Sequence, residues 1–101
     1  MKILKANEFT DAIKGEFVLI DFFADWCMPC KMIAPILEQV AESSTEYKIY
    51  KLNVDDNGPV AAKYNVRSIP TLAIFKNGVE VDRKLGFMSK PQLESWLAKN
   101  R

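Results

Sequence analysis

The only two cysteines of this 101-residue chain are Cys27 and Cys30, and just two residues separate them. On a helix, residues three apart share one face, so the two sulfurs can form and break a disulfide with little backbone movement. Such a bond closes a very small loop and stabilises the fold by only about 2 kcal/mol, less than a cross-link between distant residues. The spacing therefore favours reactive sulfur chemistry over a structural role.

Three interpretations of this Cys-x-x-Cys pair are open. It could be half of a zinc site, but the chain has no histidine and no third cysteine, so two chains would have to share the metal. It could be two inert buried cysteines. It could be a redox dithiol, which the flanking patterns favour, because a strand-like apolar run precedes the pair and a helical pattern follows. Cys27 would then lie at a helix N-terminus, which favours its thiolate, with Pro29 in the first turn and Cys30 facing inward as the less exposed sulfur.

Asp21 interrupts a run of large apolar residues, with Leu19-Ile20 before it and Phe22-Phe23 after it. One interpretation is an outward-facing charge on a half-exposed strand. Because the neighbours are apolar on both faces, we expect both faces to be covered, which would desolvate the carboxyl group and raise its pKa. Such a group beside a dithiol can accept and return a proton near neutral pH, so we assign Asp21 as the proton shuttle for Cys30.

Strand and helix patterns alternate along the chain. We expect strands at residues 2–5, 17–23, 47–54, 71–75 and 79–85. We expect a first helix from Asn7, its N-cap, to about residue 14, with Gly15 as its stop. We expect a second helix from the cysteine pair to about residue 42, with a kink at Pro35, and a third from Pro59 to about residue 64. A last helix follows Ser89, which forms a capping box with Gln92. Asn77-Gly78 predicts a hairpin between the last two strands. The order βαβαβαββα indicates an α/β fold with a parallel portion and an antiparallel edge.

Composition excludes several classes of function. The length fits one domain, and 14 basic against 13 acidic residues give a net charge of +1, which does not favour nucleic acid or membrane as a partner. We expect no membrane span and no signal peptide, and therefore a cytoplasmic location. The acidic segment 55–58 is interpreted as a turn, because the glutamate that ends an EF-hand loop is absent.

The segment Phe17 to Lys31 resembles the active-site segment of thioredoxins. The resemblance continues through residues 51–55, 67–72 and 75–78 to Gly86, in the family's order. It departs from the commonest family sequence at Met28, where glycine is usual, and at Phe23, where many members carry tryptophan. It implies a single thioredoxin domain over residues 1–101, with a mixed central β-sheet flanked by helices on both faces.

The resemblance also implies a mechanism, in which Cys27 is the nucleophile that attacks a client disulfide and Cys30 resolves the mixed disulfide. Lys51 would tune the proton of Asp21, although an ordinary exposed strand lysine is equally compatible with its position. The Ile69–Pro70 bond is expected to be cis, against the general frequency of about 5–6% for such bonds. Gly86 either permits a turn or lets a partner approach closely. The expected client contact surface consists of Trp26, Met28, Pro29, Ile69, Pro70 and Gly86.

By the same resemblance, the chain is expected to be a general protein-disulfide reductase that contributes to cell redox homeostasis. It would act as a monomer, bind no cofactor, and receive electrons from a thioredoxin reductase, an NADPH-linked flavoenzyme. Its partners would be that reductase and transiently docked proteins that contain disulfides. Two alternatives stay open: an enzyme that oxidises or isomerises disulfides, and a binding module whose main role is to stabilise a partner.

Overall fold

Five strands and four helices alternate along the computed structural model, which describes residues 1–101. The strands are β1 (Lys2–Ile3), β2 (Val18–Phe23), β3 (Lys48–Asn53), β4 (Thr71–Lys76) and β5 (Val79–Leu85). The helices are α1 (Ala6–Ala12), α2 (Met28–Ser43), α3 (Gly58–Lys63) and α4 (Lys90–Lys99). The predicted order βαβαβαββα is confirmed. None of these helices combines the length and the apolar character needed to cross a membrane.

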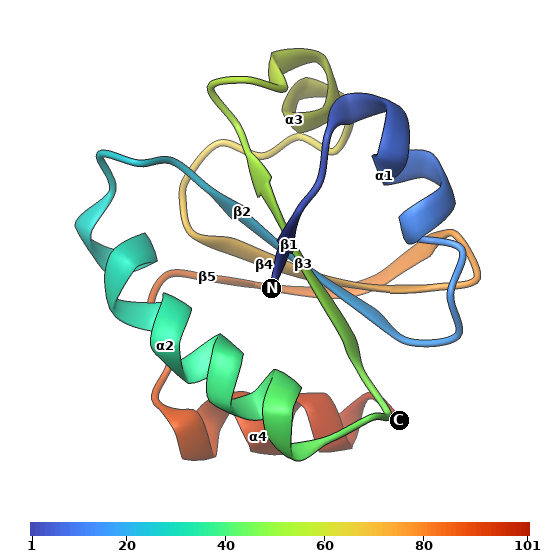
Figure 1. Cartoon of the computed structure of the whole chain (residues 1–101), viewed down its shortest axis with the longest axis vertical. Coiled ribbons are helices and arrows are strands. Elements are labelled where there is room, and N and C mark those ends of the chain that lie inside the picture. Colours follow the sequence, from blue (N-terminus) through green and yellow to red (C-terminus); the bar gives the residue numbers. More distant parts are fainter.

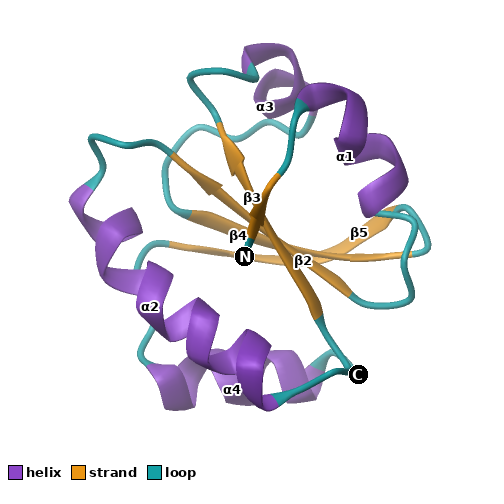
Figure 2. Ribbon diagram, in the orientation of Figure 1, coloured by secondary structure: helices purple, strands orange, loops and turns teal.

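The strands form one mixed sheet in the order β1-β3-β2-β4-β5. Strands β1, β3 and β2 are parallel, while β4 runs antiparallel to β2 and pairs with β5 as a hairpin. Helices α1 and α3 lie on one side of the sheet, and α2 and α4 lie on the other (Figures 1 and 2). The central strand β2 is therefore covered on both faces, and all six of its residues are buried.

Apolar side chains fill the space between the sheet and each pair of helices. On the α2 and α4 side, the buried cluster is Phe17, Leu19, Ile33, Leu37, Val40, Tyr47, Ile49, Leu72, Ile74, Leu93, Trp96 and Leu97. On the α1 and α3 side, it is Leu4, Phe9, Ile13, Val18, Ile20, Phe22, Leu52, Ala73 and Phe75. Complete burial of one such aliphatic or aromatic side chain contributes about 1.5–3 kcal/mol, so these two layers hold β2 and the start of α2 in fixed positions.

The first helix differs from its prediction at both ends. It begins at Ala6 with Lys5 as its N-cap, so Asn7 does not cap it. The Lys5 backbone N–H donates to the Glu8 carboxylate at 2.8 Å, and the Lys2 ammonium group pairs with the same carboxylate at 2.6 Å. The helix ends at Ala12, and Gly15 is not its left-handed stop. A Cβ at Gly15 would lie 2.9 Å from Val18 Cγ2, so close packing favours glycine there.

The predicted inner face of α2, the capping box of α4 and the hairpin turn agree with the structure. Helix α2 continues through Pro35 as one element, and its buried side carries Cys30, Ile33, Leu37 and Val40. Ser89 and Gln92 form the predicted capping box at the start of α4. Asn77 and Gly78 form the hairpin turn with φ angles of 53° and 89°, in the left-handed region that this turn requires.

Candidate active site

The two sulfurs lie at the connection between the end of β2 and the start of α2. Cys27 and Cys30 form a disulfide with their Cα atoms 5.3 Å apart. Cys27 is 4% exposed and Cys30 is 3% exposed, so the expected difference in exposure between them is very small in this oxidised state. Both pack in a small apolar cluster with Phe23 and Ala24, at the end of the central strand. The rigid strand therefore fixes the place of the disulfide in the fold.

Cys27 is the N-cap of α2, as the sequence predicted. Its Sγ accepts a hydrogen bond from the Cys30 backbone N–H at 3.2 Å. The first N–H groups of a helix have no partner inside the helix, so they are available to a side chain at the cap. Pro29 occupies this first turn, where its missing N–H costs nothing. When the disulfide is reduced, the same donor and the positive end of the helix would favour a thiolate on Cys27.

Asp21 is buried beneath this helix. It has no solvent exposure, and neither carboxylate oxygen has a hydrogen-bond partner. The interpretation of Asp21 as an outward-facing strand charge is therefore wrong. Burial raises the pKa of Asp21 from 3.8 to about 7, and the charge of Lys51 opposes this rise. A carboxyl group with a pKa near neutrality can both take and return a proton under physiological conditions.

Lys51 lies directly beside Asp21 in the sheet, because the two residues are register partners of β3 and β2. It forms no ion pair with Asp21, and its ammonium group lies 4.2 Å from the centre of the Phe23 ring. Both Lys51 and Cys30 line a partly open cavity of about 230 Å³. The other lining residues are Phe23, Ala24, Asp25, Lys31 and Ala34. The cavity therefore lies beside the disulfide on the Cys30 side, although Cys30 itself is only 3% exposed.

The Ile69–Pro70 peptide bond is cis, as the resemblance predicted. The Ile69 carbonyl oxygen lies 3.7 Å from Cys27 Sγ, so this loop contacts the disulfide directly. Gly86 belongs to the same region, because its backbone N–H donates to the Pro70 carbonyl at 2.8 Å. Its φ of 84° favours glycine, whereas a Cβ at this position would meet nothing within 4 Å.

Exposed apolar side chains surround the buried sulfurs. Trp26 is 70% exposed and Met28 is 64% exposed, while Pro29 is also exposed. Ile69 is half-buried, and Pro70 is buried, so Pro70 contributes little accessible area to the expected contact surface. Ile69 contacts Cys27, and Gly86 bonds to Pro70, so this loop lies beside the N-terminus of α2.

Sequence reasoning missed the role of Asp55. Its carboxylate accepts a hydrogen bond from the Trp26 indole N–H at 2.9 Å and so orients the large exposed ring beside the disulfide. The expected topology could have indicated this contact. Because β2 and β3 are parallel neighbours, the residues that follow them lie at the same edge of the sheet. Nowhere in the chain do three or more His, Cys, Asp or Glu side chains come together in a way that could hold a metal ion.

Comparisons with known proteins agree with this geometry. The thioredoxin family model matches residues 1–99. A thioredoxin of Chlamydia caviae is 46% identical over 93 residues, which cover 92% of this chain and 91% of the relative. A thioredoxin of Porphyra purpurea is 49% identical over 83 residues, which cover 81% of this chain and 78% of the relative. A solved structure of Plasmodium falciparum thioredoxin superposes with a TM-score of 0.93 at 38% identity and covers all of both chains.

The fold and the Cys27–Cys30 pair thus define a thiol–disulfide oxidoreductase. The chain belongs to the thioredoxin family. Its redox-active disulfide implies protein-disulfide reductase activity, as the sequence predicted.

Proposed function

We propose that the chain reduces disulfides in client proteins through a mixed disulfide on Cys27. The Cys27 thiolate attacks one sulfur of the client disulfide and expels the other as a thiolate. The Cys30 thiolate then attacks Cys27 Sγ, which forms the Cys27–Cys30 disulfide and releases the second client sulfur. The client gains two electrons and the dithiol loses two. The observation that carries this proposal is the place of Cys27, at the helix cap with the Cys30 N–H directed at its sulfur.

Asp21 is proposed to move the proton of the second step. Cys30 must lose its proton before it can attack, and it is buried, so bulk water has poor access to it. Asp21 lies on the sheet face that α2 covers and has a pKa of about 7, which suits a group that accepts a proton at one stage and returns it at another. The cavity beside Cys30 would carry that proton to solvent.

Lys51 is proposed to tune this proton transfer. Its positive charge lowers the pKa of Asp21, against the larger effect of burial. Since no ion pair fixes it to the carboxylate, its influence acts through space and depends on the ionisation of Asp21. Loss of Lys51 would therefore raise the pKa of Asp21 further and shift the pH dependence of turnover upward.

Clients are proposed to dock on the apolar surface around the disulfide. Trp26, Met28 and Pro29 would contact the client from the side of α2. The Ile69 backbone next to Pro70 would contact an extended client segment from the opposite side, and Gly86 would let that segment pass closely. A surface with little charge suits transient binding to many clients.

The oxidised chain would be reduced again by a thioredoxin reductase, an NADPH-linked flavoenzyme, so the chain itself would need no bound cofactor. We propose a cytoplasmic location, because a dithiol that must return to its reduced state works best where the surroundings are reducing. We also propose that the chain acts as a monomer.

The reduction potential of the Cys27–Cys30 pair tests the proposal, measured against a dithiol buffer with insulin reduction alongside. We expect a value near −270 mV, which is typical of a thioredoxin that acts as a reductase, and rapid insulin reduction. A value near −120 mV would instead indicate an oxidant. A Cys27→Ser, Cys30→Ser double variant that kept full biological function would indicate a binding module.

A matched pair of variants tests the role of Asp21. Asp21→Asn should slow turnover at pH 7 by about 10²-fold or more and prolong the mixed disulfide, because the proton acceptor is lost. Asp56→Asn changes an exposed aspartate in the same way and should leave turnover unchanged. Equal rates for both variants would refute the proton-transfer role.

A further inference from the structure

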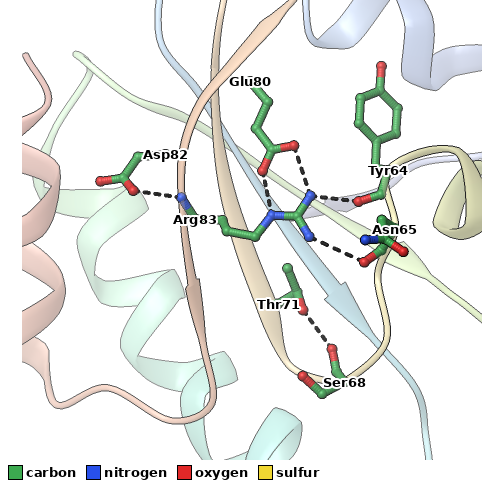
Figure 3. A network of polar contacts seen from close by, with 7 residues as sticks. All are labelled: Tyr64, Asn65, Ser68, Thr71, Glu80, Asp82 and Arg83. Carbon is green, nitrogen blue, oxygen red and sulfur yellow. Dashed lines mark hydrogen bonds and ion pairs between the residues drawn. The ribbon is translucent and has the colours of Figure 1, made fainter.

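Arg83 of β5 links the outer strand of the sheet to the end of α3. Its guanidinium group donates to both carboxylate oxygens of Glu80, at 2.6 and 2.8 Å. It also donates to the backbone carbonyl of Tyr64 at 2.7 Å and, more weakly, to that of Asn65 at 3.5 Å. Figure 3 shows the guanidinium group between the Glu80 carboxylate and these two carbonyls. Both charged side chains are partly buried, so this is not a loose surface pair.

An irregularity in β5 makes this arrangement possible. On a regular strand, residues three apart point to opposite faces of the sheet. Here Ile74 pairs with Asp82 and Phe75 pairs with Glu80, so Val81 is an extra residue that forms a β-bulge. The bulge places Glu80 and Arg83 on the same face, which α3 covers. The carboxylate can then hold the guanidinium group in the orientation that reaches Tyr64 and Asn65.

The carbonyls that Arg83 binds lie at the start of the loop that reaches the disulfide. Helix α3 ends with Asn65 in the left-handed conformation, where the N–H groups of Asn65 and Val66 bond back to Ala62 and Ala61. This motif leaves the carbonyls of Tyr64 and Asn65 without hydrogen-bond donors from the helix, and the Arg83 guanidinium group donates to both. Only a few residues later the chain reaches Ile69, whose carbonyl oxygen contacts Cys27 Sγ.

Residues nearer the end of the same loop form hydrogen bonds with the sheet and the residue that follows it. The Thr71 hydroxyl donates to the Ser68 carbonyl at 2.6 Å, and the Gly86 N–H donates to the Pro70 carbonyl at 2.8 Å. Arg83 therefore joins the first half of the loop to the sheet, and these two bonds join the second half to it. Without Arg83, the first half would be held only by the bonds of Asn65 and Val66 to helix α3.

We propose that Arg83, oriented by Glu80, is a positioning residue for client docking. It fixes the end of α3 and so holds the Ile69 backbone at the place where an extended client segment must lie beside Cys27. This role rests on the proposed docking of clients along Ile69. It acts on binding, and it leaves the sulfur chemistry of Cys27 and Cys30 unchanged.

Insulin reduction by Arg83→Met tests this role, with a small aromatic disulfide as a second substrate that needs no docking loop. We expect KM for insulin to rise about fivefold to tenfold, because a charge-assisted anchor is lost. We expect kcat, the reduction potential and the rate with the small disulfide to stay within about twofold of the wild-type values. Arg83→Lys keeps the positive charge but cannot donate to Glu80 and to both carbonyls at once, so it should give an intermediate KM for insulin.

Lys84→Met is the matched control, because Lys84 is the exposed neighbour on the opposite face of β5 and should leave KM for insulin unchanged. If Arg83→Met does not fold, Glu80→Gln removes the ion pair with a smaller change in the side chain. It should still raise KM for insulin and leave the rate with the small disulfide unchanged. An unchanged KM in the folded variants, or an equal loss with both substrates, would overturn the positioning role. A wild-type protein unable to reduce insulin would overturn the proposed function as well.

Discussion

Replacement of Asp21 with asparagine should stabilise the oxidised protein above neutral pH. Asp21 is completely buried without a hydrogen-bond partner, and burial raises its pKa from 3.8 to about 7. Such a difference between the unfolded and folded states corresponds to about 4 kcal/mol of unfolding free energy. Asparagine has nearly the same volume and cannot ionise, so it removes this cost without creating a cavity.

The effect of Asp21 on stability depends on pH in a defined direction. Below about pH 4 the carboxyl group is protonated in both states and makes no pH-dependent contribution. Between about pH 4 and 7 the unfolded chain releases the proton while the folded chain keeps it, so wild-type stability falls as the pH rises. Above about pH 7 both states are ionised, and the full loss of about 4 kcal/mol remains. The variant lacks this loss, so its advantage grows from pH 4 to 7 and then becomes constant.

Urea unfolding of the oxidised proteins, followed by far-UV circular dichroism from pH 4 to pH 9, measures this difference. Above neutral pH, the midpoint for Asp21→Asn should exceed that of the wild type by about 1–4 M urea. Asp56→Asn is the control, because Asp56 is exposed, and its curve should follow the wild type. Stability curves of Asp21→Asn and wild type that ran parallel at every pH would refute our account of the buried carboxyl group.

Three further variants test how the scaffold is held. Leu37→Ala removes a fully buried side chain from α2 and should lower the unfolding free energy by about 2–5 kcal/mol in urea titrations, and a loss below about 1 kcal/mol would contradict the packing described. Ser89→Ala removes the N-cap of α4 and should lower Tm by about 4–8 °C, whereas Ser89→Asp should retain the wild-type Tm. Gly86→Ala meets no steric obstacle, so its cost of about 1–2 kcal/mol should come from the positive φ alone, and an unchanged Tm would show that this loop relaxes.

The parts of the fold that follow from local patterns could be predicted from the sequence. The buried stripe of α2 follows from helical periodicity, and the burial of Asp21 follows from apolar neighbours on both faces of its strand. The start of α1 could not be predicted in this way, because lysine is not a capping residue. Its cap depends on the Glu8 carboxylate, which Lys2 holds from the preceding strand.

Contacts between distant residues escaped prediction for a different reason. The Trp26–Asp55 bond joins residues 29 apart, and the Arg83–Tyr64 bond joins residues 19 apart. Both depend on the sheet topology, and the second also depends on a bulge that leaves no clear mark in a single sequence. The cis Ile69–Pro70 bond was predicted only from the family resemblance, since general frequencies favour trans.

The bulge at Val81 also has a consequence for the outer edge of the sheet. Strand β5 is an outer strand of the sheet and presents three exposed apolar side chains, Val79, Val81 and Leu85. A long, flat strand of this kind would be a template for pairing with another chain, but the bulge breaks its regular ladder of backbone donors and acceptors. The opposite edge is β1, which spans only two residues. One edge of the sheet is therefore very short and the other is interrupted, and both features disfavour pairing with a further strand.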